Sequence, residues 1–98
     1  MKRITFRTAA SADMRRAARE TKARWGHAQA AVYSAGLRDD IKSLREFPLR
    51  FPEFEGGRAG LRRMNSGRHA VFYLVGEEMI EIVRVLHTAM DAKGRLGD

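Results

Sequence analysis

Residues 60–87, GLRRMNSGRHAVFYLVGEEMIEIVRVLH, contain the pattern that decides the fold. Three segments, the last two of them largely apolar, are separated by two short polar stretches, at residues 65–67 and 76–78, and each stretch contains a glycine. Glycine and asparagine between runs of β-branched and aromatic residues are typical of β-hairpins. The stretch therefore predicts a three-stranded antiparallel meander.

The last two predicted strands are apolar on both faces. Their alternating sets are Val71, Tyr73 and Val75 beside Ala70, Phe72 and Leu74, then Ile80, Ile82 and Leu86 beside Met79, Val83 and Val85. An antiparallel sheet leaves a face in water only where that face is polar, so both faces need cover. We expect helices on one face. On the other we expect the phenylalanine-bearing loop, the C-terminal tail and a segment of a partner protein.

Ahead of the meander, the sequence predicts a short strand and a first helix. Ile4 and Phe6 alternate with polar residues, as in a strand with one buried face. Ser11 is expected to cap the helix, with Asp13 in the first turn, where the helix dipole favours negative charge. Gly26 is suited to ending this helix.

A second helical pattern follows and continues until Pro48. Its apolar positions step by three or four residues: Ala30, Tyr33, Leu37, Ile41, Leu44 and Phe47. Trp25, Tyr33 and Phe47 are expected to form an inner, buried stripe of the resulting helical hairpin. Gly36 suggests that the two helices approach closely there. The element order predicts an α+β domain with the hairpin packed on one face of the sheet.

Length and composition narrow the function classes. The 98 residues fit one domain, spanning residues 1–98, and the chain has no cysteine and three histidines. We therefore expect no disulfide framework, no metal site and no cofactor. No apolar run is long enough for a signal sequence or a membrane span, so we expect a cytoplasmic protein. The net charge of +7 favours an acidic partner.

Four segments give the chain a resemblance to ParE toxins of the RelE/ParE superfamily. They are RWG at 24–26 with QA at 29–30 and Tyr33; Leu44 with FP at 47–48; GLR at 60–62 through Gly67; and HAVFY at 69–73 leading into IEIVRVLH at 80–87 and MD at 90–91. The strand segment IEIVRVLH, followed by MD, is the most specific of them. The alanine-rich first helix and the loop FPLRFPEFEGGRAG at 47–60 depart from the family pattern.

The resemblance implies the toxin of a type II toxin–antitoxin pair, with DNA gyrase as the usual target of such proteins. It also implies a ParD-like antitoxin, acidic and partly disordered, that binds the toxin tightly in a hetero-oligomeric complex. The alternative is a ribosome-dependent mRNA endonuclease of the RelE kind, for which Arg62, Arg84 and His87 are the candidate catalytic residues. Such enzymes resemble one another in a lysine- or glutamate-bearing loop before the meander and often in a C-terminal tyrosine. Here no tyrosine follows Tyr73, and the charged residues of the loop are only Arg50, Glu53, Glu55 and Arg58, so a protein without enzymatic activity is favoured.

Two surfaces are candidates for protein contacts. The target-binding candidates are Arg84, His87, Met90, Lys93, Arg95 and Leu96, which mix apolar contact with positive charge. The antitoxin-binding candidates are Arg15, Arg16, Arg19, Leu49, Phe51, Phe54, Phe72 and Leu74. Arg84 has a competing structural interpretation, an ion pair with an acid across the sheet, because it shares an alternation set with Ile80 and Ile82. Direct nucleic-acid binding is the least favoured function, because neither interleaved aromatics nor a helix-turn-helix pattern is present.

Overall fold

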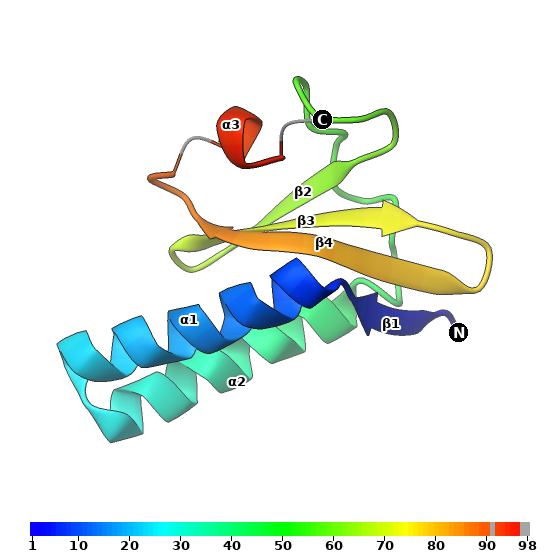
Figure 1. Ribbon diagram of the computed structural model, residues 1–98. Helices are drawn as coiled ribbons and strands as arrows, with labels where there is room; N and C mark the ends of the chain where they lie inside the picture. Colours follow the sequence, from blue (N-terminus) through cyan, green and yellow to red (C-terminus); the bar gives the residue numbers. More distant parts are fainter. Residues whose placement is uncertain (91, 97–98) are drawn as a thin grey trace.

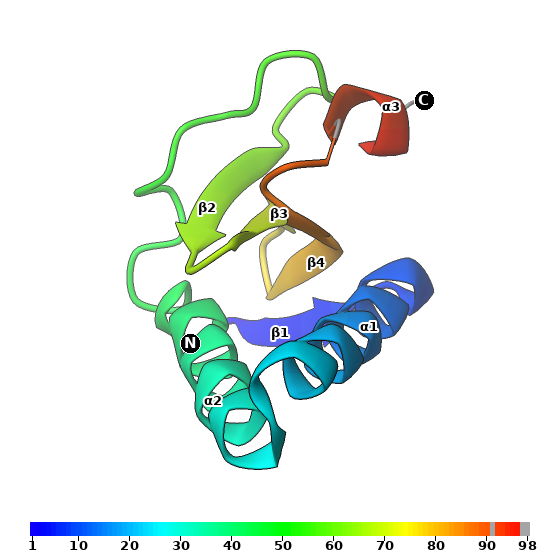
Figure 2. The same cartoon turned by 90° about the vertical axis from the view of Figure 1, so that its left-hand side faces the viewer.

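The computed structural model describes residues 1–90 and 92–96. Within these residues the elements follow in the order β1 (Arg3–Phe6), α1 (Thr8–Trp25), α2 (His27–Ser43), β2 (Arg62–Ser66), β3 (His69–Val75), β4 (Met79–His87) and α3 (Ala92–Leu96). Figures 1 and 2 show α1 and α2 side by side on one face of the sheet and α3 on the other. The predicted α+β architecture, with a strand, a helical hairpin and then a meander, is confirmed.

The sheet has the strand order β1-β4-β3-β2. Strands β2, β3 and β4 form the predicted antiparallel meander. The sequence did not indicate that β1 pairs in parallel with β4, from Arg3 opposite Met79 to Phe6 opposite Ile82. Because β1 ends there, the rest of β4 is an edge of the sheet.

A β-bulge in β4 changes which face its side chains meet. Phe72 pairs with Arg84 and Tyr73 pairs with Ile82, so Val83 is the extra residue. The prediction that Ile80, Ile82, Arg84 and Leu86 share one face was wrong for this reason. Ile80, Ile82 and Val85 belong to the cluster under the helical hairpin, whereas Val83 and Leu86 belong to the cluster on the opposite face.

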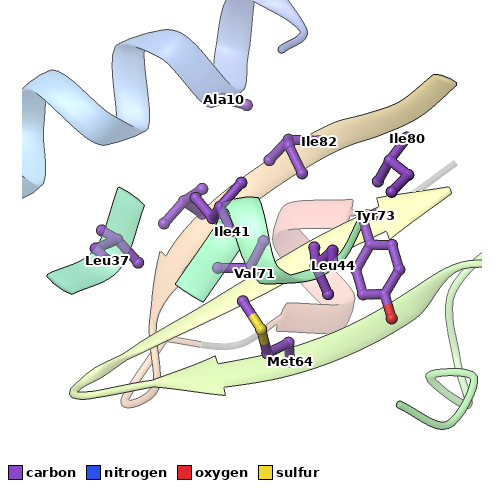
Figure 3. Close-up of a cluster of buried hydrophobic side chains, with 10 residues drawn as sticks. Ala10, Leu37, Ile41, Leu44, Met64, Val71, Tyr73, Ile80 and Ile82 are labelled. Atoms are coloured by element: carbon purple, nitrogen blue, oxygen red, sulfur yellow. The ribbon is translucent and has the colours of Figure 1, made fainter. Parts of the chain in front are cut away.

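The first core cluster lies between the helical hairpin and the sheet (Figure 3). Its members are Ala10, Leu37, Ile41, Leu44, Met64, Val71, Tyr73, Ile80, Ile82 and Val85. The α2 residues in this set recur at the helical spacing that the sequence shows, which places them on one face of the helix. The hydroxyl of Tyr73 reaches the cluster's margin and donates to the Pro48 carbonyl at 2.8 Å.

The second cluster covers the opposite face of the sheet. Its members are Leu61, Ala70, Phe72, Val83 and Leu86, and Phe54, Leu74, Met90, Ala92 and Leu96 pack against them. Phe54 meets Phe72 edge-on, with ring centroids 5.1 Å apart. The loop and the tail therefore provide cover for this face, as expected. The share expected of a partner segment stays a prediction.

The start of α1 differs from the prediction. The helix begins at Thr8, and its N-cap residue Arg7 makes no side-chain capping bond. Ser11 is inside the helix, and Asp13 lies beyond the first turn, buried at 3% exposure. The capping interpretation was wrong because the helix begins three residues before Ser11, and Asp13 has a tertiary partner, described below. A further helix, α3, forms in the tail without having been predicted.

Two of the three predicted core aromatics lie on the surface. Trp25 is 53% exposed and Phe47 is 66% exposed, while Tyr33 is half-buried. Trp25 is the last residue of α1, at the end of the hairpin that extends past the sheet (Figure 1). Phe47 lies in the turns after α2, which ends at Ser43 rather than at Pro48. The close approach inferred at Gly36 was also wrong, since nothing lies within 4 Å of where its Cβ would be.

The turn between β2 and β3 requires a glycine. Gly67 has a φ of +57°, and a Cβ at this position would lie 2.8 Å from the Tyr33 ring. The same turn brings the Arg68 backbone N–H to the Tyr33 hydroxyl, to which it donates at 3.0 Å. Tyr33 therefore holds the β2–β3 turn against the helical hairpin.

Gly67→Ala is expected to lower the free energy of unfolding by about 1–2 kcal/mol from the left-handed backbone alone. The contact with Tyr33 adds to this loss, because the ring would have to move. Urea unfolding followed by circular dichroism measures the change. Gly36→Ala is the matched control, since that position is helical and open, and it should stabilise the protein by up to about 1 kcal/mol. Equal effects at the two positions would contradict the prediction.

No helix within the described part of the chain combines the length and apolarity needed to cross a membrane.

Candidate functional site

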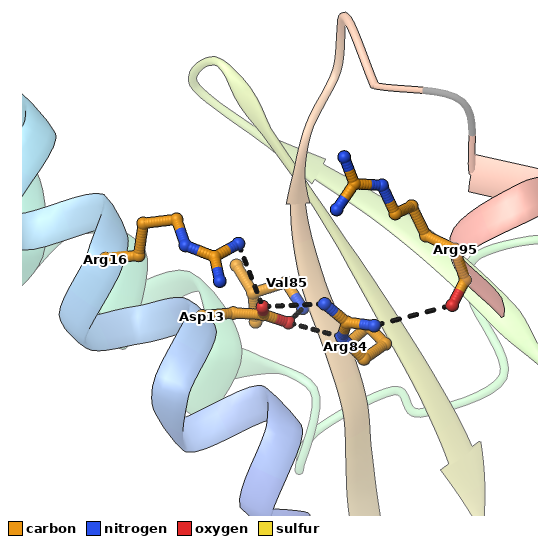
Figure 4. A network of polar contacts seen from close by, with 5 residues as sticks. All are labelled: Asp13, Arg16, Arg84, Val85 and Arg95. Atoms are coloured by element: carbon orange, nitrogen blue, oxygen red, sulfur yellow. Dashed lines mark hydrogen bonds and ion pairs between the residues drawn. The ribbon is translucent and has the colours of Figure 1, made fainter.

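A buried ion pair joins α1 to the free edge of β4 (Figure 4). The Asp13 carboxylate accepts from Arg84 Nε at 2.7 Å and from Arg84 Nη2 at 2.9 Å. It also accepts from the Val85 backbone N–H at 2.9 Å, and Arg16 lies 3.9 Å away. These hydrogen bonds raise the pKa of the Arg84 guanidinium, so it stays charged. The structural ion pair expected for Arg84 exists, but its acid is on a helix rather than across the sheet.

The ion pair also provides a hydrogen-bond acceptor for a backbone N–H at the edge of the sheet. Strand β1 stops opposite Ile82, so the Val85 N–H has no neighbouring strand to receive it. Asp13 takes the place of that missing backbone acceptor, and Arg84 balances the charge that Asp13 carries.

Arg84 also contacts the C-terminal tail. Its Nη1 donates to the Arg95 carbonyl of α3 at 3.4 Å, while Met90 and Leu96 are half-buried on the second core cluster. Lys93 and Arg95 are exposed. Among the target-binding candidates, the structure therefore brings the tail residues and Arg84 together, and the Lys93 side chain lies against Gly56 of the loop. Asp91, in the segment used for the resemblance, lies outside the described residues.

His87 is separate from this group. It stands opposite His69 in the β3–β4 register, and the two imidazole rings are 5.6 Å apart and nearly perpendicular. Its Nδ1 accepts from the Ala89 backbone N–H at 3.1 Å.

Two of the three candidate ribonuclease residues have their guanidinium groups engaged in structural contacts. Arg62 Nη1 donates to the carbonyls of Phe51 at 2.6 Å and Leu49 at 3.3 Å, which holds the loop to β2. Arg84 is engaged by Asp13. None of the hydrogen bonds among residues 1–90 and 92–96 joins two of the three candidates.

The antitoxin-binding candidates are exposed to very different degrees. Arg15 and Arg19 are exposed on α1, Arg16 is partly exposed, and Leu49 is exposed in the loop. Phe51, Phe54 and Leu74 are half-buried against the two core clusters. Phe72 is fully buried beneath Phe54, so it offers no open surface in this structure.

Sequence reasoning missed a pocket of about 510 Å³ between the second half of α1 and the facing ends of β3 and β4. Trp25 lines it together with Arg24, Arg68, His69 and His87. Burial lowers the pKa of His69, with His87 and Arg68 acting in the same direction. An antiparallel register places the first residue of β3 opposite the last residue of β4, so the two histidines could have been paired from the hairpin alone.

Comparisons with known proteins give consistent matches. A family model described as "ParE toxin of type II toxin-antitoxin system, parDE" matches residues 4–92. Toxin ParE1 of Caulobacter vibrioides is 47% identical over 74 residues, covering 76% of each chain. Toxin ParE of Escherichia coli is 35% identical over 91 residues, covering 91% of this chain and 87% of the relative.

Solved structures share the fold. A chain of the "Chromosomal ParDE TA system from P. aeruginosa" superposes with a TM-score of 0.77 at 16% identity, covering 89% of this chain and 96% of that one. A chain of the toxin–antitoxin complex RelBE2 from Mycobacterium tuberculosis gives a TM-score of 0.60 at 21% identity, covering 88% of this chain and 96% of that one.

Proposed function

Because this chain belongs to the ParE toxin family of type II toxin–antitoxin systems, we propose that it inhibits DNA gyrase and that a tightly bound cognate antitoxin neutralises it. The observation that carries the proposal is the family match, which spans residues 4–92 and agrees with relatives that are themselves named ParE toxins. DNA gyrase is the usual target of the ParE toxins that four segments of this sequence resemble. We expect such a protein in the cytoplasm, where gyrase and its DNA are.

The side-chain geometry supports action by binding rather than by catalysis. Arg62 and Arg84 are both occupied in holding the fold together, and His87 lies apart from them. The net charge of +7 suits an acidic protein surface and speeds association with it. The similar folds found in the ParDE and RelBE2 assemblies support an antitoxin partner.

Purified protein is expected to block the supercoiling of relaxed plasmid by DNA gyrase and to cause cleaved plasmid to accumulate. The product of the adjacent antitoxin gene, added in equal amount, should restore supercoiling. Relaxation by topoisomerase I is the specificity control and should be unaffected. In cells, induction without antitoxin should produce DNA breaks while messenger RNA stays intact.

The opposite pattern would reject the gyrase proposal. Unchanged supercoiling together with ribosome-dependent transcript cleavage would identify an endonuclease of the RelE kind. Arg62, Arg84 and His87 would then be reconsidered as catalytic residues, with a rearrangement needed to free the two guanidinium groups.

A further inference from the structure

Five of the residues that line the pocket beside Trp25 carry N–H donors on their side chains: Arg24, Trp25, Arg68, His69 and His87. The Arg68 guanidinium carbon lies 5.5 Å from the centroids of the Trp25 and Tyr33 rings, so this cation is held by the aromatic rings. No acid forms an ion pair with Arg68 among the described residues. Arg24 adds a second cation, and Glu20 is the one acid that lines the pocket within the part of the chain that the structure describes.

The imidazoles of His69 and His87 each add an Nε2–H donor, because their Nδ1 atoms accept hydrogen bonds. The Tyr33 hydroxyl accepts from the Arg68 N–H, and of the two acceptors within reach of its own proton, His69 Nδ1 at 2.6 Å is closer than the Ser66 carbonyl at 3.4 Å, so we assign the proton to the contact with His69. His87 Nδ1 accepts from the Ala89 N–H. In a neutral imidazole the proton then sits on Nε2. Both histidines therefore carry an Nε2–H, and neither Nε2 has a partner among residues 1–90 and 92–96.

The net charge of the pocket-lining residues matches a ligand group with a single negative charge. His69 is only 6% exposed, and the lowering of its pKa by burial keeps it neutral near pH 7. Arg24 and Arg68 contribute two positive charges and Glu20 one negative charge, which leaves an excess of one. A carboxylate supplies one negative charge, and an arginine binds it through two parallel hydrogen bonds. A phosphate group carries nearly two charges at this pH.

We propose that this pocket binds a carboxylate side chain on an acidic segment of the antitoxin. The inference rests on the proposed function, because the antitoxin is the acidic partner that the family assignment provides. The half-exposed indole of Trp25 beside the carboxylate site offers apolar contact to the same segment, and tryptophan and arginine are the residues most often responsible for affinity at protein interfaces.

Calorimetric titration of the whole chain with the product of the adjacent antitoxin gene tests the proposal. Arg68→Gln is expected to weaken binding at least tenfold, and Arg24→Gln several-fold. Arg45→Gln is the matched control, because Arg45 is also exposed but lies beyond the end of α2, outside the pocket lining. It should bind within about twofold of the unchanged chain. Melting temperatures should show that all three variants are folded.

Nuclear magnetic resonance of the histidine rings gives a second measurement. A carboxylate against Nε2–H stabilises the imidazolium, so the pKa of His69 should rise when the antitoxin binds. The proposal is overturned if Arg68→Gln and Arg24→Gln bind as tightly as Arg45→Gln, or if the pKa of His69 does not rise. It is also overturned if inorganic phosphate shifts the His69 and His87 signals at concentrations where acetate does not. If the unchanged chain fails to bind the antitoxin, the proposed function itself fails.

Discussion

Asp13→Ala is expected to lower the free energy of unfolding by about 3–5 kcal/mol. The substitution leaves the mostly buried Arg84 guanidinium without its counter-charge and the Val85 N–H without an acceptor. Both groups then pay for desolvation without compensation. A domain of this size has only about 5–15 kcal/mol of total stability, so a large part of it would be lost.

Urea unfolding, followed by circular dichroism, measures the change directly. Arg16→Ala is the control, because Arg16 is 3.9 Å from the same carboxylate but partly exposed, and such a pair contributes at most about 1 kcal/mol. Asp13→Asn keeps the volume and should also be strongly destabilising, since it removes the charge that balances Arg84. A loss below about 1 kcal/mol for both Asp13 variants would show that Arg84 and Val85 find other partners or water.

The local pattern of apolar, polar and glycine residues was sufficient to predict most of the fold. Alternation and glycine turns predicted the meander, because each strand pairs with its neighbour in sequence and its register follows from the turn. The parallel pairing of β1 with β4 was not predictable in this way, since it joins segments at opposite ends of the chain. The bulge at Val83 was missed for a related reason, because an apolar residue in an apolar strand leaves no sign of an extra position.

The side-chain partners were less predictable than the elements. Asp13 was expected in the first turn of a helix, where the dipole favours an acid, but it lies beyond that turn and its partner Arg84 is 71 residues away. Trp25 fits an apolar stripe, but the stripe extends beyond the end of the sheet that would bury it (Figure 1). Helical spacing indicates which residues share a face of a helix. Only the packed structure shows which part of that face is not buried against the sheet.

The tail offers a way to separate target binding from stability. Met90 and Leu96 cover the second core cluster, whereas Lys93 and Arg95 are exposed. A double substitution, Lys93→Glu with Arg95→Glu, is therefore expected to leave the melting temperature almost unchanged. It should weaken binding to gyrase by about 100-fold, because reversed charges at an interface cost several kcal/mol. Growth inhibition at equal expression should be lost accordingly, while antitoxin affinity is retained.

Leu96→Ala serves as the opposite control. It removes apolar cover and should cost about 1 kcal/mol of stability, since Leu96 is only half-buried. Its two neighbouring cations stay in place, so a folded Leu96→Ala protein should still inhibit gyrase. Simple truncation after Met90 cannot make this distinction, because it removes the cover and the cations together. If the charge-reversed protein still inhibits gyrase as the unchanged chain does, the tail acts as cover alone. The target surface would then be sought on α1, where Arg15 and Arg19 are exposed.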